Sequence, residues 1–331
     1  TKLPTRLVAQ ISKQQAITVN IWKKAKAAKN FSLFKPELEK LVALNVEAAD
    51  ILMKAKQTKT PYDALVDIFE PKMNSKTIVK VFTELEQGLK ALLAKIESSP
   101  NQPDINVIYQ QVPVDKQREI SRLLVQTLGY DTISSEAAGR IDESEHPFTT
   151  GYYDDVRITT HYYSENIVSS IFSVLHETGH ALYEQGLPQE WKYQPVGAPA
   201  SMGLHESQSR LYENLIGRST QFWIPLWSKV KAIIAPSFVD LDLDKFIHAI
   251  NAVKPSKIRI ESDEVTYNLH IIIRFQIEKD LFEGKINVSE LPTVWNQKYQ
   301  EILGVTVEND TEGVMQDTHW ASGLYGYFPS Y

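Results

Sequence analysis

Apolar residues recur every three or four positions along most of this chain, which is the spacing of one face of an α-helix. Ile78, Phe82, Leu85 and Leu89 illustrate the pattern. It predicts helices at residues 5–28, 32–56, 75–98, 115–128, 165–185, 201–235, 241–253, 260–283, 288–303 and 311–322, with a loop from Pro100 to Pro113. The chain is therefore predicted to be mainly α.

Residues 130–163 are the one region with strand character. There Val156 and Ile158 alternate with Arg157 and Thr159, and alternation with a period of two is typical of a strand with one buried face. No internal repeat, low-complexity tract or linker divides the sequence. We expect a single mainly helical domain over residues 1–331 with a small sheet.

Composition narrows the class of protein. A hydrophobic fraction of 43% and a charged fraction of 23% are typical of a globular protein with a sizeable core. A net charge of −6 offers no basic face for nucleic acid, and neither a membrane-spanning apolar run nor a signal-peptide pattern is present. The absence of cysteine excludes disulfides and a thiolate metal site. We expect a cytoplasmic protein without a nucleic-acid or membrane partner.

The segment His-Glu-Thr-Gly-His at 176–180 is the strongest chemical signal, because residues four apart share one face of a helix. His176 and His180 can therefore offer two imidazole nitrogens to one metal ion. Glu177 would lie beside that ion, where it could accept a proton from water. This is the arrangement of a zinc peptidase, although two histidines on a partly buried helix are the alternative.

The helix that carries this segment has plausible ends at Ser164, as N-cap, and Gly186, as the C-terminal stop. Gly179 in its interior costs about 1 kcal/mol relative to alanine. A crowded metal site or close helix packing would explain this glycine equally well. A tetrahedral site needs a third protein ligand. Glu206 lies in the next helical segment, after a loop rich in glycine and proline. We favour a role as this ligand for Glu206 over a purely helix-stabilising one.

Further motifs accompany these residues: His146-Pro147-Phe148, a DxRxT segment at 155–159, His205-Glu206-Ser207-Gln208, Ile258 to Asp263, and a GxxQDxHW segment at 313–320. Together they resemble the carboxypeptidase Taq family of zinc- or cobalt-dependent carboxypeptidases. Ser262 stands where that family has alanine, a small change expected to be harmless. The motif-bearing catalytic part extends over 146–331. Because family members are longer at both ends, we expect this chain to be an excerpt.

The resemblance implies a zincin-like peptidase fold with the small sheet beside the active-site cleft, and a homodimer. It also implies Glu206 as third ligand and Glu177 as catalytic base. The expected reaction is removal of C-terminal amino acids by metal-activated water attack, with Zn²⁺ or Co²⁺ bound by His176, His180 and Glu206. Glu177 would take a proton from water and pass it to the leaving amine. His319 and His146 are candidates to stabilise the oxyanion, with Tyr331 as a further candidate.

A carboxypeptidase must bind the free carboxylate of its peptide substrate. Arginine is best suited, since its planar fork gives two charge-assisted hydrogen bonds and keeps its charge. The motif at 258–263 makes Arg259 the leading candidate, and Arg157 in the DxRxT segment is the second. Tyr331 could also contact the carboxylate, by analogy with the family's segment, in which threonine stands where this chain has Ser330.

Two alternatives remain open from the sequence. One is another zinc peptidase with the same ligand layout, an oligoendopeptidase or dipeptidase, against which Arg259 and the GxxQDxHW segment argue. The other is a non-catalytic helical binding module stabilised by a metal. Glu177 argues against this module, since a structural site needs ligands but no general base.

Overall fold

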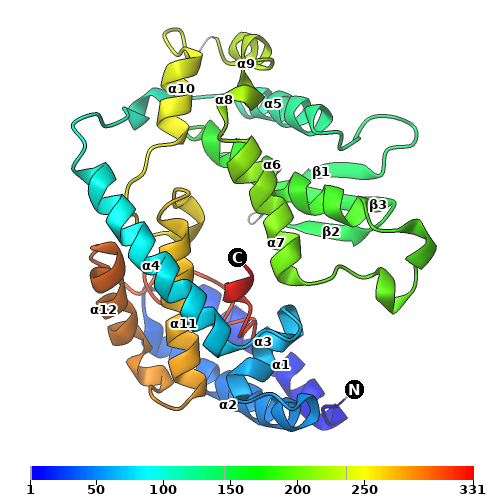
Figure 1. Cartoon of the computed structure of the whole chain (residues 1–331), viewed down its shortest axis with the longest axis vertical. Helices are drawn as coiled ribbons and strands as arrows, with labels where there is room; N and C mark the ends of the chain where they lie inside the picture. The colour runs from blue at the N-terminus through cyan, green and yellow to red at the C-terminus, as the bar shows by residue number, and fades with distance from the viewer. Residues whose placement is uncertain (1, 145–146, 236) are drawn as a thin grey trace. The chain divides into compact units, whose positions relative to one another are not determined.

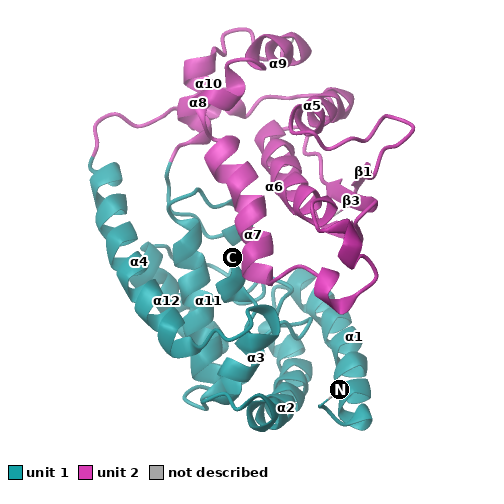
Figure 2. Cartoon of the chain, turned by 45° about the vertical axis from the view of Figure 1, so that its right-hand side comes forward, with its two compact units in different colours: residues 1–98, 253–331 teal, residues 99–252 magenta. Residues whose placement is uncertain are grey.

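A computed structural model describes residues 2–144, 147–235 and 237–331 of the chain. These residues form twelve α-helices and one three-stranded sheet, which confirms the prediction of a mainly α protein with a small sheet (Figure 1). The chain divides into two compact units, unit 1 (residues 1–98 and 253–331) and unit 2 (residues 99–252), coloured in Figure 2. The single domain stays a prediction, because two such units can belong to one domain.

Unit 1 is a helical body built around one buried helix. Its α-helices are α1 (Thr5–Ala27), α2 (Phe31–Lys56), α3 (Pro61–Phe69), α4 (Ser75–Glu97), α11 (Tyr267–Phe282) and α12 (Leu291–Leu303). Buried residues lie on every side of α11, which contacts α3, α4 and α12. A helix that is buried all round belongs in the middle of a core. Helix α11 therefore organises this unit.

Unit 2 is centred on α6, which contacts α5, α7, β2 and β3. Its elements are α5 (Val114–Thr127), β1 (Gly139–Glu143), β2 (Thr149–Tyr152), β3 (Asp155–Thr160), α6 (Ile167–Gln185), α7 (Met202–Arg210), α8 (Thr220–Trp223), α9 (Trp227–Ile234) and α10 (Leu243–Ile250). Strand β3 lies between β1, to which it is parallel, and β2, to which it is antiparallel. Val156 and Ile158 pack against Val174 and Ala181 of α6. The sheet thus covers the predicted metal-binding helix.

Three predicted helices need correction. The helix predicted at 260–283 begins only at Tyr267, after a short 3₁₀ turn at Arg259–Glu261. Helix α6 begins at Ile167 with Asn166 rather than Ser164 as its N-cap, because the Asn166 side chain accepts a hydrogen bond from the Ser169 N–H. The predicted helix at 201–235 is divided into α7, a π-helical turn at Leu211–Ile216, α8 and α9. Gly217 and Pro225 fall between these pieces, and both residue types interrupt helices.

The predicted helix at 311–322 is wrong. These residues form successive turns, with hydrogen bonds such as Gln316 N–H to Gly313 O and Met315 N–H to Asp310 O instead of a regular helical ladder. The side chain of Asp317 accepts hydrogen bonds from the side chains of two buried arginines and that of Gln316 accepts from the side chain of one of them, and these tertiary contacts outweigh the helical pattern. Helix α3 was not predicted, although Thr60 caps it and Pro61 occupies its first turn.

A buried carboxylate, that of Glu278, ties α11 to two other parts of unit 1. Its Oε1 accepts a hydrogen bond from Trp320 Nε1 at 2.7 Å, and its Oε2 accepts from the Gly326 N–H at 2.9 Å and from Tyr62 Oη at 3.0 Å. Gly326 has φ +81°, and a Cβ there would lie 2.7 Å from Val66 N. Glu278 and Gly326 together hold the segment before Tyr331 against α3.

Burial raises the pKa of Glu278 from 4.5 to about 7 despite these hydrogen bonds. Below pH 4.5 both folded and unfolded states are protonated, so the unfolding free energy should fall as the pH rises from 4.5 to about 7, by roughly 3 kcal/mol from this group. Urea unfolding between pH 4.5 and 8 should therefore show a shallower decline for Glu278→Gln than for the wild type. Equal pH slopes would contradict this expectation.

None of the helices in the described ranges has the length and apolar character needed to cross a bilayer.

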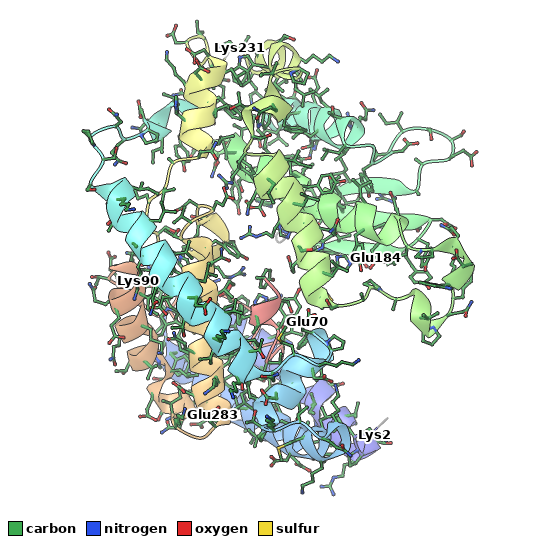
Figure 3. The ribbon with its side chains drawn as sticks, in the orientation of Figure 1. Lys2, Glu70, Lys90, Glu184, Lys231 and Glu283 are labelled. Atoms are coloured by element: carbon green, nitrogen blue, oxygen red, sulfur yellow. The ribbon has the colours of Figure 1, made fainter. Side chains whose placement is uncertain are left out.

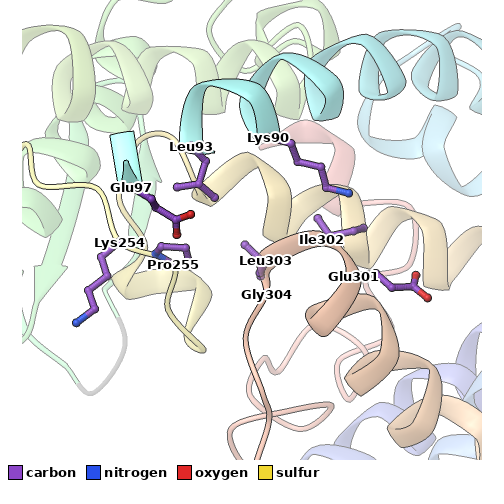
Figure 4. A pocket seen from close by; sticks show the side chains of 9 residues that line it. All are labelled: Lys90, Leu93, Glu97, Lys254, Pro255, Glu301, Ile302, Leu303 and Gly304. Carbon is purple, nitrogen blue, oxygen red and sulfur yellow. The ribbon is translucent and has the colours of Figure 1, made fainter. Parts of the chain in front are cut away.

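An open surface cavity of about 560 Å³ lies in unit 1, where the end of α4 meets the end of α12 and Lys254 (Figure 4). Its lining contains none of the site residues predicted from the sequence.

Candidate metal and active site

The three predicted metal ligands lie together in unit 2. His176 and His180 come from α6 and Glu206 from α7, and their donor atoms all lie within 4.8 Å of one another. Glu206 Oε2 is 3.6 Å from each histidine Nε2. Ligand atoms bound at about 2.0–2.1 Å around a tetrahedral ion lie about 3.4 Å apart. The spacing and the imidazole–imidazole–carboxylate chemistry therefore fit a divalent metal such as zinc.

Neighbouring side chains fix the orientation of these donors. His176 Nδ1 lies 2.7 Å from Glu213 Oε2, which also accepts a hydrogen bond from Arg210 Nη1 at 2.7 Å. Ser209 Oγ donates to Glu206 Oε2 at 3.0 Å. With Nδ1 of His176 occupied as a donor, its Nε2 presents a lone pair to a metal.

Glu177, the predicted base, lies beside the ligands and is buried. Thr149 Oγ1 in the edge strand β2 donates a hydrogen bond of 2.6 Å to Glu177 Oε2. Burial raises the pKa of Glu177 above its ordinary value, against the lowering effects of His176 and Thr149. A carboxylate with a raised pKa and a fixed rotamer is suited to accept and return a proton.

Gly179 is explained by the close approach of α6 and α7. A Cβ at this position would lie 2.6 Å from Gln208 O and 2.7 Å from Ser209 Cα, both in the backbone of the helix that carries Glu206. The two explanations given for this glycine therefore coincide, because the close packing is what brings the third donor to the two histidines.

Gly179→Ala should consequently destabilise the protein and weaken metal binding, although alanine is the better helix former by about 1 kcal/mol. Either α7 must move away from α6, carrying Glu206 with it, or α6 must deform. Gly88→Ala in α4 is the matched control, since a Cβ there meets nothing within 4 Å and should stabilise the fold. Thermal unfolding and zinc titration measure both effects, and a rise in stability of Gly179→Ala with unchanged zinc affinity would contradict the interpretation.

Unit 1 contains the predicted carboxylate-binding residue. Arg259 is 5% exposed; its Nε and Nη2 donate to Asp317 Oδ1 at 3.1 and 2.8 Å, and its Nη1 donates to Tyr267 Oη at 2.6 Å. Arg274, which is fully buried, donates from Nε to Asp317 Oδ2 at 2.6 Å. Two guanidinium groups thus converge on one carboxylate, and they hold the pKa of Asp317 far below its usual range against the opposing effect of burial.

Arg259 also lies close to two other predicted residues. The Tyr331 ring centroid is 4.9 Å from its guanidinium carbon, and Tyr331 Oη is 3.2 Å from His319 Nε2. Burial lowers the pKa of His319 to about 3, so this imidazole is neutral near pH 7. Unit 1 therefore brings Arg259, His319 and Tyr331 together, as a cluster distinct in sequence from the metal ligands.

The remaining predicted residues are placed differently. His146 lies outside the described residues. Arg157 is exposed in β3 and forms a two-pronged ion pair with Asp155. Because side chains alternate along a strand and Val156 and Ile158 face α6, Arg157 projects from the opposite face of the sheet. Its substrate role stays a prediction.

Several contacts of the site were not predicted. Glu213 follows Glu206 by two helical turns on the same chain segment, and this spacing could have indicated it. His205, to which the sequence assigned no role, has its Nδ1 2.6 Å from His180 Nδ1. Thr149 carried no local signal, since only the packing of β2 on α6 brings it to Glu177.

Comparisons with known proteins agree with this geometry. A family model described as Carboxypeptidase Taq (M32) metallopeptidase matches residues 1–331. Carboxypeptidase 1 of Bacillus subtilis is 45% identical over 311 residues, covering 94% of this chain and 61% of that protein. Thermostable carboxypeptidase 1 of Thermus thermophilus is 42% identical over 336 aligned positions, covering 99% and 65% respectively. The crystal structure of an M32 carboxypeptidase from Deinococcus radiodurans matches with a TM-score of 0.92 and 32% identity, covering 100% of this chain and 66% of that one.

The chain thus spans less than two thirds of the length of the curated relatives it matches, at 61% and 65%. The resemblance found in the sequence is confirmed over all 331 residues rather than only the motif-bearing part. By sequence and by fold, this chain belongs to the carboxypeptidase Taq (M32) metallopeptidase family.

Proposed function

We propose that this protein is a zinc-dependent metallocarboxypeptidase that removes C-terminal amino acids from peptides. The observation that carries the proposal is the convergence of His176, His180 and Glu206 on one point with Glu177 beside them. Membership of a metallopeptidase family implies a divalent metal, and the relatives named above are carboxypeptidases. We favour Zn²⁺, although two histidines and a glutamate also suit Co²⁺.

His176 and His180 would bind the metal through Nε2 and Glu206 through its carboxylate. When bound, the metal acts as a Lewis acid that polarises the scissile carbonyl and lowers the pKa of water. The protein's own task is to hold these donors in place, which Glu213 and Ser209 support by their hydrogen bonds.

Glu177 is assigned the proton transfers. It takes a proton from the attacking water and delivers it to the amine that leaves when the last peptide bond breaks. The Thr149 hydroxyl donates a hydrogen bond to Oε2 of Glu177 and fixes the orientation of this carboxylate, which leaves Oε1 of Glu177 to accept and release the proton. Strand β2, at the edge of the sheet, would bind the substrate main chain in extended form, because an edge strand has free backbone hydrogen-bonding groups.

Arg259 is assigned the substrate's terminal carboxylate. Arg259 and Arg274 both pair with Asp317, which is the only carboxylate within ion-pair distance of either arginine in the described residues. Within the described part of the chain, one positive charge of this cluster therefore lacks a matching carboxylate, and buried charges are strongly favoured to find one. Two of the five guanidinium N–H groups of Arg259 remain available once its described hydrogen bonds are counted.

His319 is assigned to the developing oxyanion. A neutral imidazole can donate from one nitrogen without carrying a charge into a buried site, and burial keeps the pKa of His319 at about 3. Tyr331, within hydrogen-bonding distance of His319 Nε2, is a further donor, and His146 is retained as a candidate from the sequence. Arg157 is retained as the second candidate for the carboxylate.

The deciding experiment compares matched peptides with a free and an amidated C-terminus. A carboxypeptidase releases the last amino acid from the free peptide and acts poorly on the amidated one. Equal cleavage of both, at internal bonds, would indicate an oligoendopeptidase; tight zinc binding without cleavage of any peptide would indicate the non-catalytic module.

Removal of a ligand should abolish metal binding. We expect His176→Ala and Glu206→Ala to lose most of their zinc affinity, as measured by competition with a chromophoric chelator. His248→Ala is the matched control, since His248 is an exposed residue of α10 in the same unit. If Glu206→Ala still binds one equivalent of zinc tightly, the third ligand lies elsewhere.

Homodimer formation and a cytoplasmic location stay predictions. Light scattering of the purified protein tests the first, and cell fractionation tests the second.

A further inference from the structure

We propose that His205 is a positioning residue that holds His180 in the tautomer able to bind the metal, and that Glu184 in turn sets the tautomer of His205. The inference rests on the metal site of the proposed function. It assigns a role to two residues that are not themselves among the metal ligands.

The three side chains form a chain of hydrogen bonds within unit 2. His180 Nδ1 lies 2.6 Å from His205 Nδ1, and His205 Nε2 lies 3.0 Å from Glu184 Oε1. Glu184, labelled in Figure 3, lies one helical turn after His180 on α6, while His205 comes from α7. His205 is 7% exposed, and its ring packs edge-on against the Tyr183 ring with centroids 5.0 Å apart. The relay is therefore buried and held by packing.

The proton positions follow from what each atom can donate or accept. A carboxylate only accepts, so the nitrogen of His205 that faces Glu184, Nε2, must carry the hydrogen. A neutral imidazole has one N–H, which leaves Nδ1 of His205 as an acceptor. His180 must then donate from Nδ1, and its Nε2 is left with a lone pair directed at the metal donors. Reversing any step would put a hydrogen on His180 Nε2, and a protonated nitrogen cannot be a ligand.

The intervening ring also keeps a negative charge at a distance. Glu177, Glu206 and Glu213 already surround the two histidines. A carboxylate hydrogen-bonded directly to His180 would add a fourth negative charge. His205 instead transmits the polarity of Glu184 as a hydrogen bond, and Glu184 stays one ring further from the metal. The two ligand histidines are thus oriented by different means, His176 by a carboxylate and His180 by an imidazole.

The first test replaces His205 by two residues of different hydrogen-bonding ability. His205→Phe keeps a flat ring but removes the acceptor, whereas Asn in His205→Asn has its Oδ1 near the position of Nδ1 and can accept from His180. Loss of an outer partner of a ligand typically costs 10–100-fold in metal affinity. We expect His205→Phe to weaken zinc binding by that factor and His205→Asn to stay within about threefold of the wild type. His248→Phe, the same substitution at an exposed position of the unit, should have no effect.

The second test asks whether Glu184 acts through His205. Glu184→Met should weaken zinc binding several-fold in the wild type, because His205 loses the partner that fixes its tautomer. In the His205→Asn background, Glu184→Met should leave the zinc affinity unchanged, since the amide oxygen of Asn accepts a hydrogen bond without help from Glu184. Equal losses in both backgrounds would show that Glu184 acts by another route and overturn the relay.

Competition with a chelator gives the zinc affinities, and ¹⁵N spectra of histidine-labelled, metal-free protein report the tautomers without reference to turnover. In the wild type we expect the ¹⁵N signals of His180 to show a hydrogen on Nδ1. In His205→Phe we expect a mixture of the Nδ1–H and Nε2–H tautomers of His180. Unchanged spectra and unchanged affinity in His205→Phe would overturn the inference while the metal site stands. A wild-type protein that binds no zinc would overturn both the proposed function and this inference.

Discussion

Glu177→Gln should keep the metal and lose nearly all turnover. Glutamine has the size of glutamate and its amide oxygen can accept the hydrogen bond from Thr149, so the fold and the three ligands are preserved. It cannot accept a proton, however, and general acid–base catalysis typically contributes about 10²–10⁴-fold. We expect kcat to fall by about that factor, with a full equivalent of zinc still bound, as measured by steady-state kinetics and metal analysis of the same preparation.

Glu190→Gln is the matched control, because Glu190 is an exposed glutamate of unit 2. It should leave kcat unchanged. A near-normal kcat for Glu177→Gln would end the proposal that this residue activates water. Loss of zinc together with activity would mean that Glu177 helps to hold the ligands, and would require a different base.

Arg259→Ala should lower kcat/KM for peptides with a free C-terminus. Removing one partner of a buried, ionised pair costs about 2–5 kcal/mol, which at about 1.4 kcal/mol per decade is roughly 30-fold to several thousand-fold. The already poor hydrolysis of amidated peptides should hardly change, because they carry no carboxylate to lose. Arg259→Lys should recover only part of the activity, since a point charge cannot reproduce the guanidinium fork.

The structure adds a second consequence of the same substitution. Arg259→Ala leaves Asp317 paired with Arg274 alone, so some loss of stability is expected and must be measured separately by thermal unfolding. Comparison of the two peptide classes separates these effects, because a purely structural loss lowers both rates equally. Arg157→Ala is the parallel variant. If it, rather than Arg259→Ala, discriminates between free and amidated peptides, the carboxylate-binding role belongs to Arg157.

The sequence predicted elements well where local pattern and packing agree. Helix α6 combines an apolar stripe with HExxH spacing, and both are satisfied by one buried face against the sheet. Residues 311–322 have a helical pattern too, but Gln316 and Asp317 bind Arg259 and Arg274, partners more than 40 positions away. Long-range ion pairs of this kind leave no periodic trace in the sequence.

The candidate site shows the same division. A spacing of four residues predicts His176 and His180 as metal ligands. Glu206 could be chosen because a tetrahedral site needs a third protein donor and this residue lies near the start of the next helical segment. The contact between Thr149 and Glu177 depends instead on how a short strand packs across α6. Likewise, the pairing of His205 with His180 requires the close backbone approach that Gly179 permits.

The division into a contiguous unit and a split one has a consequence for the order of folding. Unit 2 is formed by one uninterrupted segment, whereas unit 1 joins residues far apart, as in the hydrogen bonds from Trp22 Nε1 to Met315 O and from Gln15 Nε2 to Ser322 O. Contacts close in sequence form before distant ones. During synthesis the helices that carry the metal donors can therefore pack while α1 to α4 still await α11 and the segment beyond it.

Pulse-labelling hydrogen exchange during refolding should accordingly protect α6 and α7 before α1 and α2, and the reverse order would contradict this expectation. Until residues 253–331 have been made, the apolar faces of α3 and α4 that later pack against α11 remain without their partner. Such transiently exposed apolar surface is what aggregates or recruits chaperones. Solubility of the nascent chain thus depends on how soon α11 and α12 emerge from the ribosome.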